Sequence, residues 1–250
     1  PSLRSSALPP MLAIVTQQAG FALITAPRVA PTRTAPVQME TVADLEKLAV
    51  SLNPTVGYWD PLALASAGSG STEAGWDESA FIGFLRHAEI KHGRVAMAAF
   101  VGFIVQSNGI HFPWDLTFTD HISHASIAAA GGPPAQWDAL PTASKLQIFG
   151  FIGFLEGWGE NKNALEAQGQ KHYMRGGKPG FFPSFQETTG SKPAIHPVPL
   201  DLFDPFKLQK KMSPEAKSKS LLAEINNGRL AMLGIMAFVA EAKVPGAVPA

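Results

Sequence analysis

The sequence EIKHGRVAM, residues 89–97, is nearly repeated as EINNGRLAM, residues 224–232. Over the eighteen residues that begin with each copy, seven positions are identical. An internal repeat of this kind indicates two equivalent structural units. Neither copy contains proline and both are rich in Ala, Leu, Met and Ile, so each unit is predicted to be one helix.

Polar residues precede a long apolar run in both copies. Residues 95–105 and 230–240 are all apolar or Gly, and each run follows a Glu, a His or Asn, and an Arg. At about 100° per residue, Glu89 and His92 share one helix face, whereas Arg94 points about 140° away from Glu89. The Arg of each copy therefore cannot easily neutralise the Glu of its own helix.

Two such helices that cross with pseudo-twofold symmetry would supply each Glu with a partner. The crossing can pair Glu89 with Arg229 and Glu224 with Arg94. Buried charges are tolerated when they are paired in this way, whereas a lone buried charge is costly. We therefore expect both ion pairs in the structure.

Donor atoms remain unused after this pairing. A carboxylate bonded to Arg has spare oxygens, His92 has a free ring nitrogen, and Asn227 has an amide oxygen. Each of these atoms suits a single axial bond to Mg²⁺ or a similar metal. Gly93 and Gly228 lie on nearly the same face as their Glu residues, which leaves room for a large flat group or for a closely approaching backbone.

The motif E-x-x-[H/N]-x-R-x-A-M, present twice in one chain of this size, resembles that of the light-harvesting chlorophyll-binding proteins of plants and algae. The resemblance implies an all-α membrane protein with three transmembrane helices, joined by short amphipathic helices and long loops. The first and third helices would cross as a pseudo-twofold pair, locked by the ion pairs of Arg94 and Arg229. The implied ligands of chlorophyll magnesium are Glu89, His92, Glu224 and Asn227.

The composition restricts the other possibilities. The 250 residues include 20 acidic and 20 basic side chains, so the formal net charge of zero gives no indication of nucleic-acid binding. The absence of Cys excludes disulfides, thiolate metal sites and a Cys nucleophile. No run reaches 18 uninterrupted apolar residues, so hydropathy alone would indicate buried helices of a soluble protein. The membrane prediction therefore rests on the paired charges and on the resemblance.

The rest of the chain is predicted to surround this pair. Residues 1–39 contain no acidic residue and are typical of a transit-peptide remnant or a flexible N-terminal arm. Residues 40–250 are expected to form a single chlorophyll-binding antenna domain, with a short amphipathic helix over 41–52. The long helices are expected at about 77–107, 142–160 and 213–242, joined by irregular connections at 109–141 and 161–212.

The resemblance also implies candidate sites outside the two motifs. Further pigment ligands would be Gln106, Gln147, Glu156 and Glu241, although the family usually has Gln where Glu241 stands. Two turns, one before each copy, would flank the central carotenoids: Trp59, Asp60, Pro61 and Leu62, and Asp204, Pro205 and Phe206. The alternative for these turns is a Pro turn held by an Asx hydrogen bond. Three loop histidines allow a metal site, a ligand of a peripheral chlorophyll or no special role: His111, His121 and His124.

The function that the resemblance implies is light harvesting rather than enzymatic catalysis. The segments EIKHGRVAM, FIGFLE and EINNGRLAM are more similar to the chlorophyll a/c antennae of dinoflagellates and haptophytes than to the plant a/b antennae. This implies chlorophyll a, chlorophyll c and a xanthophyll such as peridinin or fucoxanthin, with diadinoxanthin as a further candidate. The protein would be a multi-pass protein of the chloroplast thylakoid membrane. Its partners would be a photosystem I or II core, neighbouring antenna subunits and thylakoid lipids.

Three alternatives remain open from the residues. A photoprotective quencher of the same family is one, although the loops contain no acidic cluster of the kind that would sense lumenal pH. A di-iron carboxylate oxidase also uses E-x-x-H, but the second copy has Asn227 where a second His is required. The third alternative is a helix pair in which the ion pairs serve packing alone.

Overall fold

The computed structural model describes residues 41–66, 77–117, 119–185, 206, 208 and 211–248. The chain divides into two units, Pro1–Pro36 and Val37–Ala250, and all described residues belong to the second. The predictions for residues 1–39, and those for Asp204 and Pro205, lie outside the described residues. Within the described ranges every regular element is a helix, and the only bridge of β type joins Asp115 to Ser123.

Three long helices occur where the sequence predicts them. They are α2 (Glu78–Ser107), α5 (Thr142–Gly159) and α7 (Pro214–Lys243). The α7 helix begins as expected, because the Ser213 side chain accepts a hydrogen bond from the backbone N–H of Ala216 and Pro214 occupies the first turn. At 30 residues each, α2 and α7 are about 45 Å long.

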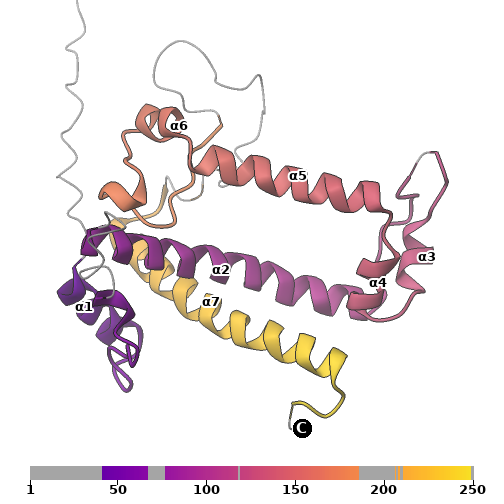
Figure 1. Cartoon of the computed structure of the whole chain (residues 1–250), viewed down its shortest axis with the longest axis horizontal. Helices are drawn as coiled ribbons and strands as arrows, with labels where there is room; N and C mark the ends of the chain where they lie inside the picture. The colour runs from indigo at the N-terminus through magenta and orange to yellow at the C-terminus, as the bar shows by residue number, and fades with distance from the viewer. Residues whose placement is uncertain are drawn as a thin grey trace, which may run out of the picture. The chain divides into compact units, whose positions relative to one another are not determined.

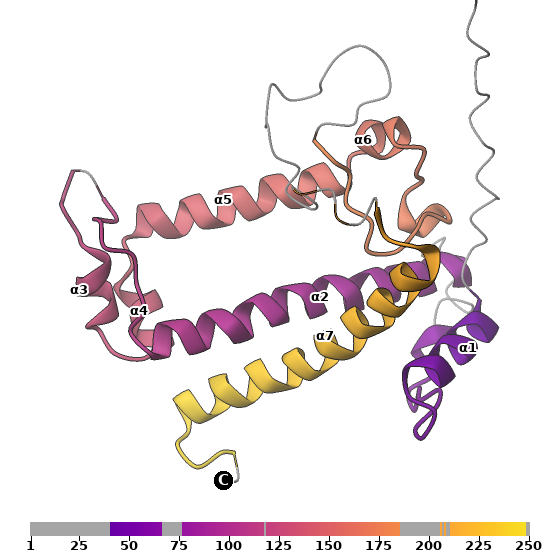
Figure 2. The same cartoon turned by 180° about the vertical axis from the view of Figure 1, so that it is seen from behind.

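The α2 and α7 helices lie side by side in both views (Figures 1 and 2). Their closest approach is at Gly93 and Gly228, where a Cβ built on Gly228 would lie 2.9 Å from the Cα of Gly93. The space that the glycines leave at the crossing is thus filled by the partner backbone. Further along, the rings of Phe100 and Phe238 stack with their centroids 4.9 Å apart.

At one end of the molecule, two short helices connect α2 to α5. They are α3 (His124–Ala128) and α4 (Pro133–Ala139), and both lie in the segment expected to be irregular. That expectation is wrong because the Gly-Gly-Pro-Pro sequence starts a helix: Pro is favourable in a first turn, where its missing N–H leaves no bond unmade. Gln136 of α4 fixes the end of α2 by donating from its side chain to the carbonyl of Gln106 at 3.1 Å.

At the other end, the connection after α5 folds back onto α2. It contains α6 (Lys162–Ala167) and a 3₁₀ turn, η2 (Tyr173–Arg175). Trp158 of α5 packs with Ala164 and Phe185, and its indole N–H donates to the carbonyl of Pro183 at 3.0 Å. The described part of the segment predicted as an irregular surface loop is therefore packed, because apolar residues anchor it between its polar stretches.

The α1 helix (Val42–Leu52) packs near the beginning of the α2–α7 pair. Leu52, Ile90 and Ile225 form a buried cluster that joins the three helices. The Asn226 side chain of α7 donates to the carbonyl of Leu52 at 3.2 Å. This contact ties the end of α1 to the second copy of the repeat.

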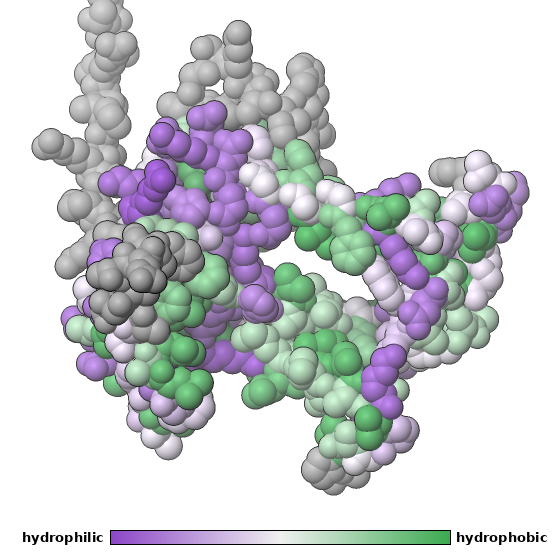
Figure 3. Space-filling model, viewed as in Figure 1, coloured by the Kyte–Doolittle hydropathy of each residue, from purple (hydrophilic) through white to green (hydrophobic). Residues whose placement is uncertain are grey.

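Much of the apolar surface of the long helices faces outward. Phe149 of α5 is 60% exposed, Val95 of α2 is 70% exposed and Leu233 of α7 is 72% exposed. Figure 3 shows hydrophobic surface over α5 and over the α2–α7 pair. Of the helices described, none combines the length and the apolar character required of a membrane span.

Candidate pigment-ligand site at the helix crossing

Both ion pairs expected at the crossing are present. The Nε atom of Arg229 donates to Oε1 of Glu89 at 2.7 Å, and the Nε atom of Arg94 donates to Oε1 of Glu224 at 2.5 Å. The pairs flank the Gly93–Gly228 contact, so the two helices exchange one ion pair on each side of their closest approach. All four charged side chains remain between about a quarter and a half exposed.

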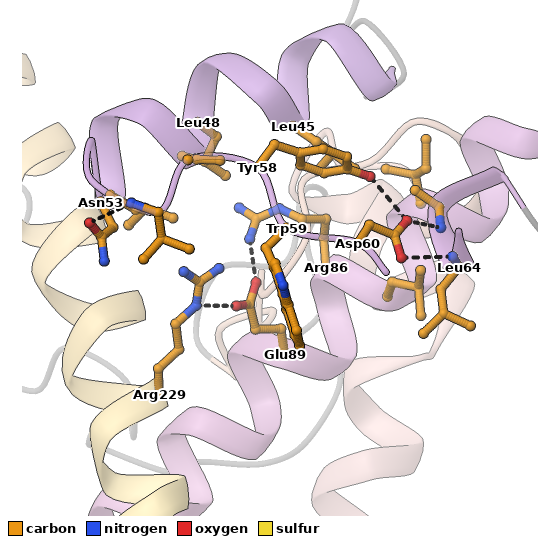
Figure 4. Close-up of a pocket in the computed structure, with 17 residues that line it drawn as sticks. Leu45, Leu48, Asn53, Tyr58, Trp59, Asp60, Leu64, Arg86, Glu89 and Arg229 are labelled. Atoms are coloured by element: carbon orange, nitrogen blue, oxygen red, sulfur yellow. Dashed lines mark hydrogen bonds and ion pairs between the residues drawn. The ribbon is translucent and has the colours of Figure 1, made fainter. Parts of the chain in front are cut away.

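The two halves of the crossing differ in their additional partners. Glu89 has a second cation, because Nη1 of Arg86 lies 2.7 Å from its Oε2 atom (Figure 4). Arg94 instead donates from Nη1 to the backbone carbonyl of Gly180 at 2.6 Å. Sequence reasoning missed both contacts. The spacing of three residues between Arg86 and Glu89 is a signal for the first contact, whereas nothing in the local sequence indicates the second.

His92 has one ring nitrogen committed and one available. Its Nδ1 atom lies 2.7 Å from the carbonyl oxygen of Ala88, one turn earlier in the same helix. A carbonyl oxygen only accepts, so in the neutral imidazole Nδ1 carries the proton and Nε2 keeps its lone pair. The side chain is exposed, and a neutral imidazole with one free nitrogen is the form that ligates metals.

Asn227 stands at the equivalent position of the second repeat. It is exposed, and its side-chain amide has no hydrogen-bond partner among the described residues. Its oxygen is a neutral donor suited to Mg²⁺. The arrangement therefore places a carboxylate held by an arginine, and a neutral donor one turn further on, on each helix of the crossing.

The other four predicted ligands lie in different surroundings. Gln106 and Gln147 have exposed side chains. Oε2 of Glu156 lies 2.6 Å from Nζ of Lys91, an ion pair that the sequence did not predict. Glu241 accepts hydrogen bonds from the backbone N–H groups of Gly246 and Val248, so this carboxylate also closes the turn after α7.

The first Asp-Pro turn is held by hydrogen bonds from backbone N–H groups four and five residues after Asp60 to its side chain, which is a longer closure than an Asx turn. Oδ1 of Asp60 accepts from the N–H of Leu64, and Oδ2 accepts from the N–H of Ala65, each at 2.9 Å. These backbone donors, with that of Ala65 contributing most, hold the pKa of the Asp60 carboxyl below its usual value. Trp59 and Leu62 are each 75% exposed and Phe206 of the second turn is 77% exposed, so their apolar side chains are available to a ligand.

A cavity of about 580 Å³ lies between this turn, α1 and the beginning of α2. Leu45 and Leu48 of α1 line one part of it, Arg86, Glu89 and Arg229 line another, and Trp59 of the turn also lines it (Figure 4). The cavity is thus apolar on the side of α1 and carries the Glu89 ion pairs on the side of the crossing. It combines a hydrophobic wall with a charged end.

A cluster of polar side chains joins α5 and the η2 segment to α2. Nε2 of His172 lies 2.5 Å from Oε2 of Glu160, and the ring of His87 stacks on Tyr173 at 3.9 Å. Burial would raise the pKa of the Glu160 carboxyl, but the hydrogen bond of His172 and the charges of His172 and Lys91 outweigh it, and the pKa lies below its usual value. His172 thus helps to hold the η2 segment against the end of α5.

The loop histidines make separate contacts. Nδ1 of His124 lies 2.7 Å from the carbonyl oxygen of Trp114, and Nδ1 of His121 lies 3.3 Å from a carboxylate oxygen of Asp115. The described part of the chain contains no group of three or more His, Asp or Glu residues placed to hold a metal ion. Neither a histidine metal site nor a di-iron centre is therefore supported there.

Comparison with known proteins agrees with the motif. Residues 44–243 match the family model described as Chlorophyll A-B binding protein. Over 191 residues the chain is 32% identical to the fucoxanthin-chlorophyll a-c binding protein F, chloroplastic, of Phaeodactylum tricornutum, and the match covers 76% of each chain. Over 241 residues it is 30% identical to the fucoxanthin-chlorophyll a-c binding protein, chloroplastic, of Trieres chinensis, covering 95% of this chain and 97% of that one.

Proposed function

The chain belongs to the chlorophyll A-B binding protein family, and from this premise we propose that it is a light-harvesting antenna protein of the chlorophyll a/c type. Its relatives are named for fucoxanthin and for chlorophylls a and c, and these are the pigments that we assign to it. Bound chlorophylls and xanthophylls supply the absorption of light and the transfer of excitation. The protein supplies ligands, spacing and exclusion of water.

One observation carries the assignment of the ligands. At the crossing, each arginine compensates the charge of a carboxylate on the other helix. The carboxylate oxygens still have lone pairs that the arginine does not use. Glu89 and Glu224 can therefore each bind one magnesium ion while they hold the helices together. His92 and Asn227, which are exposed and have a free donor atom, are assigned to two further chlorophylls.

The space beside the helices fits large flat groups. Beyond its own stretch of helix backbone, a Cβ built on Gly102 of α2, or on Gly150 or Gly153 of α5, would meet no atom within 4 Å. These positions are therefore open, in contrast to Gly93 and Gly228 at the crossing. Outward-facing apolar residues on α5 and on the α2–α7 pair would contact the rings and tails of the pigments. Gln106, Gln147, Glu156 and Glu241 are the candidate ligands for the chlorophylls further from the crossing.

The carotenoid sites are assigned to the two Asp-Pro turns. Trp59 and Leu62 present exposed apolar surface beside a turn that Asp60 fixes with two backbone hydrogen bonds. The apolar wall of the adjacent cavity extends that surface. A rigid turn next to an apolar wall is suited to hold one end of a xanthophyll.

We place the protein in the thylakoid membrane with α2, α5 and α7 as its three transmembrane helices. The relatives are chloroplastic by name, and the outward apolar side chains of the long helices support contact with lipid or pigment. The reciprocal ion pairs provide each charge near the crossing with a partner, as a membrane interior requires. The partners would be a photosystem core and neighbouring antenna subunits.

Fluorescence excitation of the purified protein tests the function. The protein would be isolated from its membrane in mild detergent, and emission of chlorophyll a would be recorded while the excitation wavelength is scanned. We expect chlorophyll c and xanthophyll bands in the excitation spectrum, with an intensity close to their share of the absorption. Pigments that absorb but do not appear in the excitation spectrum would contradict light harvesting. A strongly shortened emission lifetime would indicate a quencher.

A further inference from the structure

Within the nine-residue copies EIKHGRVAM and EINNGRLAM, the formal charge changes at one position. Lys91 in EIKHGR corresponds to Asn226 in EINNGR. Each of these residues contacts an element that has no counterpart in the other half: Asn226 donates to Leu52 at the end of α1, and Lys91 contacts Glu156 of α5. This position therefore carries, in each half, a contact that the other half lacks.

Lys91 reaches two carboxylates near the end of α5. Its Nζ atom lies 2.6 Å from Oε2 of Glu156 and 3.6 Å from Oε1 of Glu160. Glu160 has its own partner in His172, with an N–O distance of 2.5 Å. Glu156 has no other cation among the described residues. The charge of Lys91 is therefore directed chiefly at Glu156.

A carboxylate that ligates magnesium requires a nearby cation when water is excluded, because an isolated charge in a low-dielectric site is strongly disfavoured. Glu89 and Glu224 receive that cation from the facing helix. The α5 helix has a single basic residue, Lys145, which is eleven residues and about 16 Å from Glu156 along the axis. The compensating charge for Glu156 must come from another element, and Lys91 is the residue in contact.

We propose that Lys91 is the positioning residue for Glu156, so that Glu156 joins Glu89 and Glu224 as a carboxylate ligand compensated by a cation from a different helix. The inference rests on the proposed function, because it requires Glu156 to hold a chlorophyll. Lys91 bonds Oε2 and leaves Oε1 of Glu156 without a hydrogen-bond partner among the described residues. Lys91 thus orients the carboxylate with one oxygen turned to the ligand.

The alternative is an ordinary surface ion pair that serves only to hold α5 near α2. Exposed pairs of Lys and Glu contribute little to stability, and here the side chain of Glu156 is 56% exposed. The two explanations differ in what they require of residue 156. A positioning role depends on the negative charge of Glu156, whereas a docking role depends on the contact itself.

Refolding of the full chain with chlorophyll a, chlorophyll c and fucoxanthin in detergent distinguishes the positioning role of Lys91 from the docking role. The number of chlorophylls per chain and the circular dichroism in the visible range would be measured for six variants, two of which serve as the ligand test and the control below. We expect Lys91→Met to lose about one chlorophyll and Lys91→Arg to keep it. We expect Glu156→Gln to keep it as well, because a neutral amide oxygen can ligate without a counter-cation. The double variant Lys91→Met/Glu156→Gln should therefore regain the chlorophyll that Lys91→Met loses.

Two results would overturn the inference. One is a normal chlorophyll content in Lys91→Met while Glu156→Leu lacks one chlorophyll. The other is a double variant that binds as few chlorophylls as Lys91→Met. That result would show that chlorophyll binding needs the contact between residues 91 and 156 and not the compensation of charge. If Glu156→Leu itself keeps all its chlorophyll, the assignment of Glu156 as a ligand fails independently. Lys162→Met is the matched control, because it removes the lysine of a surface pair with Glu166 on α6 and should change nothing.

Discussion

At the scale of residues, the two ion pairs of the crossing look equivalent in the sequence but differ in the structure. Glu89 is bonded by both Arg229 and Arg86, whereas Glu224 has Arg94 as its only cationic partner among the described residues. Removing Arg229 leaves Glu89 compensated, but removing Arg94 leaves Glu224 alone. The second change should therefore be the more harmful one.

We accordingly predict that Arg94→Leu lowers the yield of pigmented protein in refolding far more than Arg229→Leu. Stranding a fully buried charge costs about 3–5 kcal/mol. Because Glu224 is partly exposed, we expect about 2–3 kcal/mol for Arg94→Leu and less than half of that for Arg229→Leu. Arg175→Leu is the control, since this exposed arginine has no carboxylate partner in the described part of the chain. Equal losses in the two crossing variants would contradict the role given to Arg86.

The neutral donors lead to a second prediction at this scale. His92→Leu should remove about one chlorophyll per chain, because leucine has no lone pair for magnesium. His92→Asn should retain it, since Asn227 occupies the equivalent position in the second repeat. Chlorophyll content per protein after refolding is the measurement. If His92→Leu binds as many chlorophylls as the unmodified chain, His92 is not a ligand.

At the scale of elements, the closeness of α2 and α7 depends on the two glycines at their crossing. A Cβ on Gly228 would lie 2.9 Å from the Cα of Gly93, and backbone cannot move aside as a flexible side chain can. Overpacking of this kind costs about 1–3 kcal/mol. For a chain of this size that corresponds to a fall in melting temperature of roughly 2–10 °C for Gly228→Ala.

The melting temperature would be followed by the loss of visible circular dichroism of the refolded pigment–protein. Gly102→Ala is the matched control on α2, because beyond its own stretch of helix backbone its Cβ would meet no atom within 4 Å. Alanine favours the helix over glycine by about 1 kcal/mol, and because both variants gain this contribution, the comparison with Gly102→Ala removes it. If Gly228→Ala has the same melting temperature as Gly102→Ala, the helices do not cross at this contact.

The helices themselves could be predicted because their signals are local. The repeat identifies α2 and α7, and Ser213 followed by Pro214 marks the beginning of α7. The crossed ion pairs could be predicted as well, since symmetry between the copies fixes which Glu meets which Arg. These features depend on residue spacing within a helix or on the internal repeat, and the sequence shows both directly.

The contacts that sequence reasoning missed are of a different kind. Arg94 bonds the carbonyl of Gly180 and Lys91 bonds Glu156, and each contact joins segments more than 60 residues apart that no repeat relates. The fold of the connection after α5 was missed for the same reason, because its anchors, such as Trp158 with Pro183, are tertiary contacts. Polar composition alone does not distinguish a packed connection from an irregular one.

At the scale of the whole molecule, the direction of the chain has a consequence for its topology. The α2 helix ends beside α3 and α4, α5 runs back, and α6 follows at the opposite end (Figure 1). If α2 and α5 cross a membrane, α3 and α6 must lie on opposite faces of it. If α2 and α5 instead lie along one membrane surface, α3 and α6 are accessible to a water-soluble reagent from the same side of the membrane.

The chain has no Cys, so single cysteines can test this topology without background. In sealed thylakoid vesicles we expect a water-soluble maleimide to label Asn163→Cys on α6 from one face only, and Ala125→Cys on α3 from the other face only. Phe149→Cys and Leu233→Cys should resist labelling until detergent is added, because lipid and pigment would cover these outward side chains. Labelling of both short helices from the same face would exclude a membrane-spanning arrangement of α5. Labelling of Phe149→Cys and Leu233→Cys in intact vesicles would contradict the contact with lipid and pigment that the light-harvesting role requires.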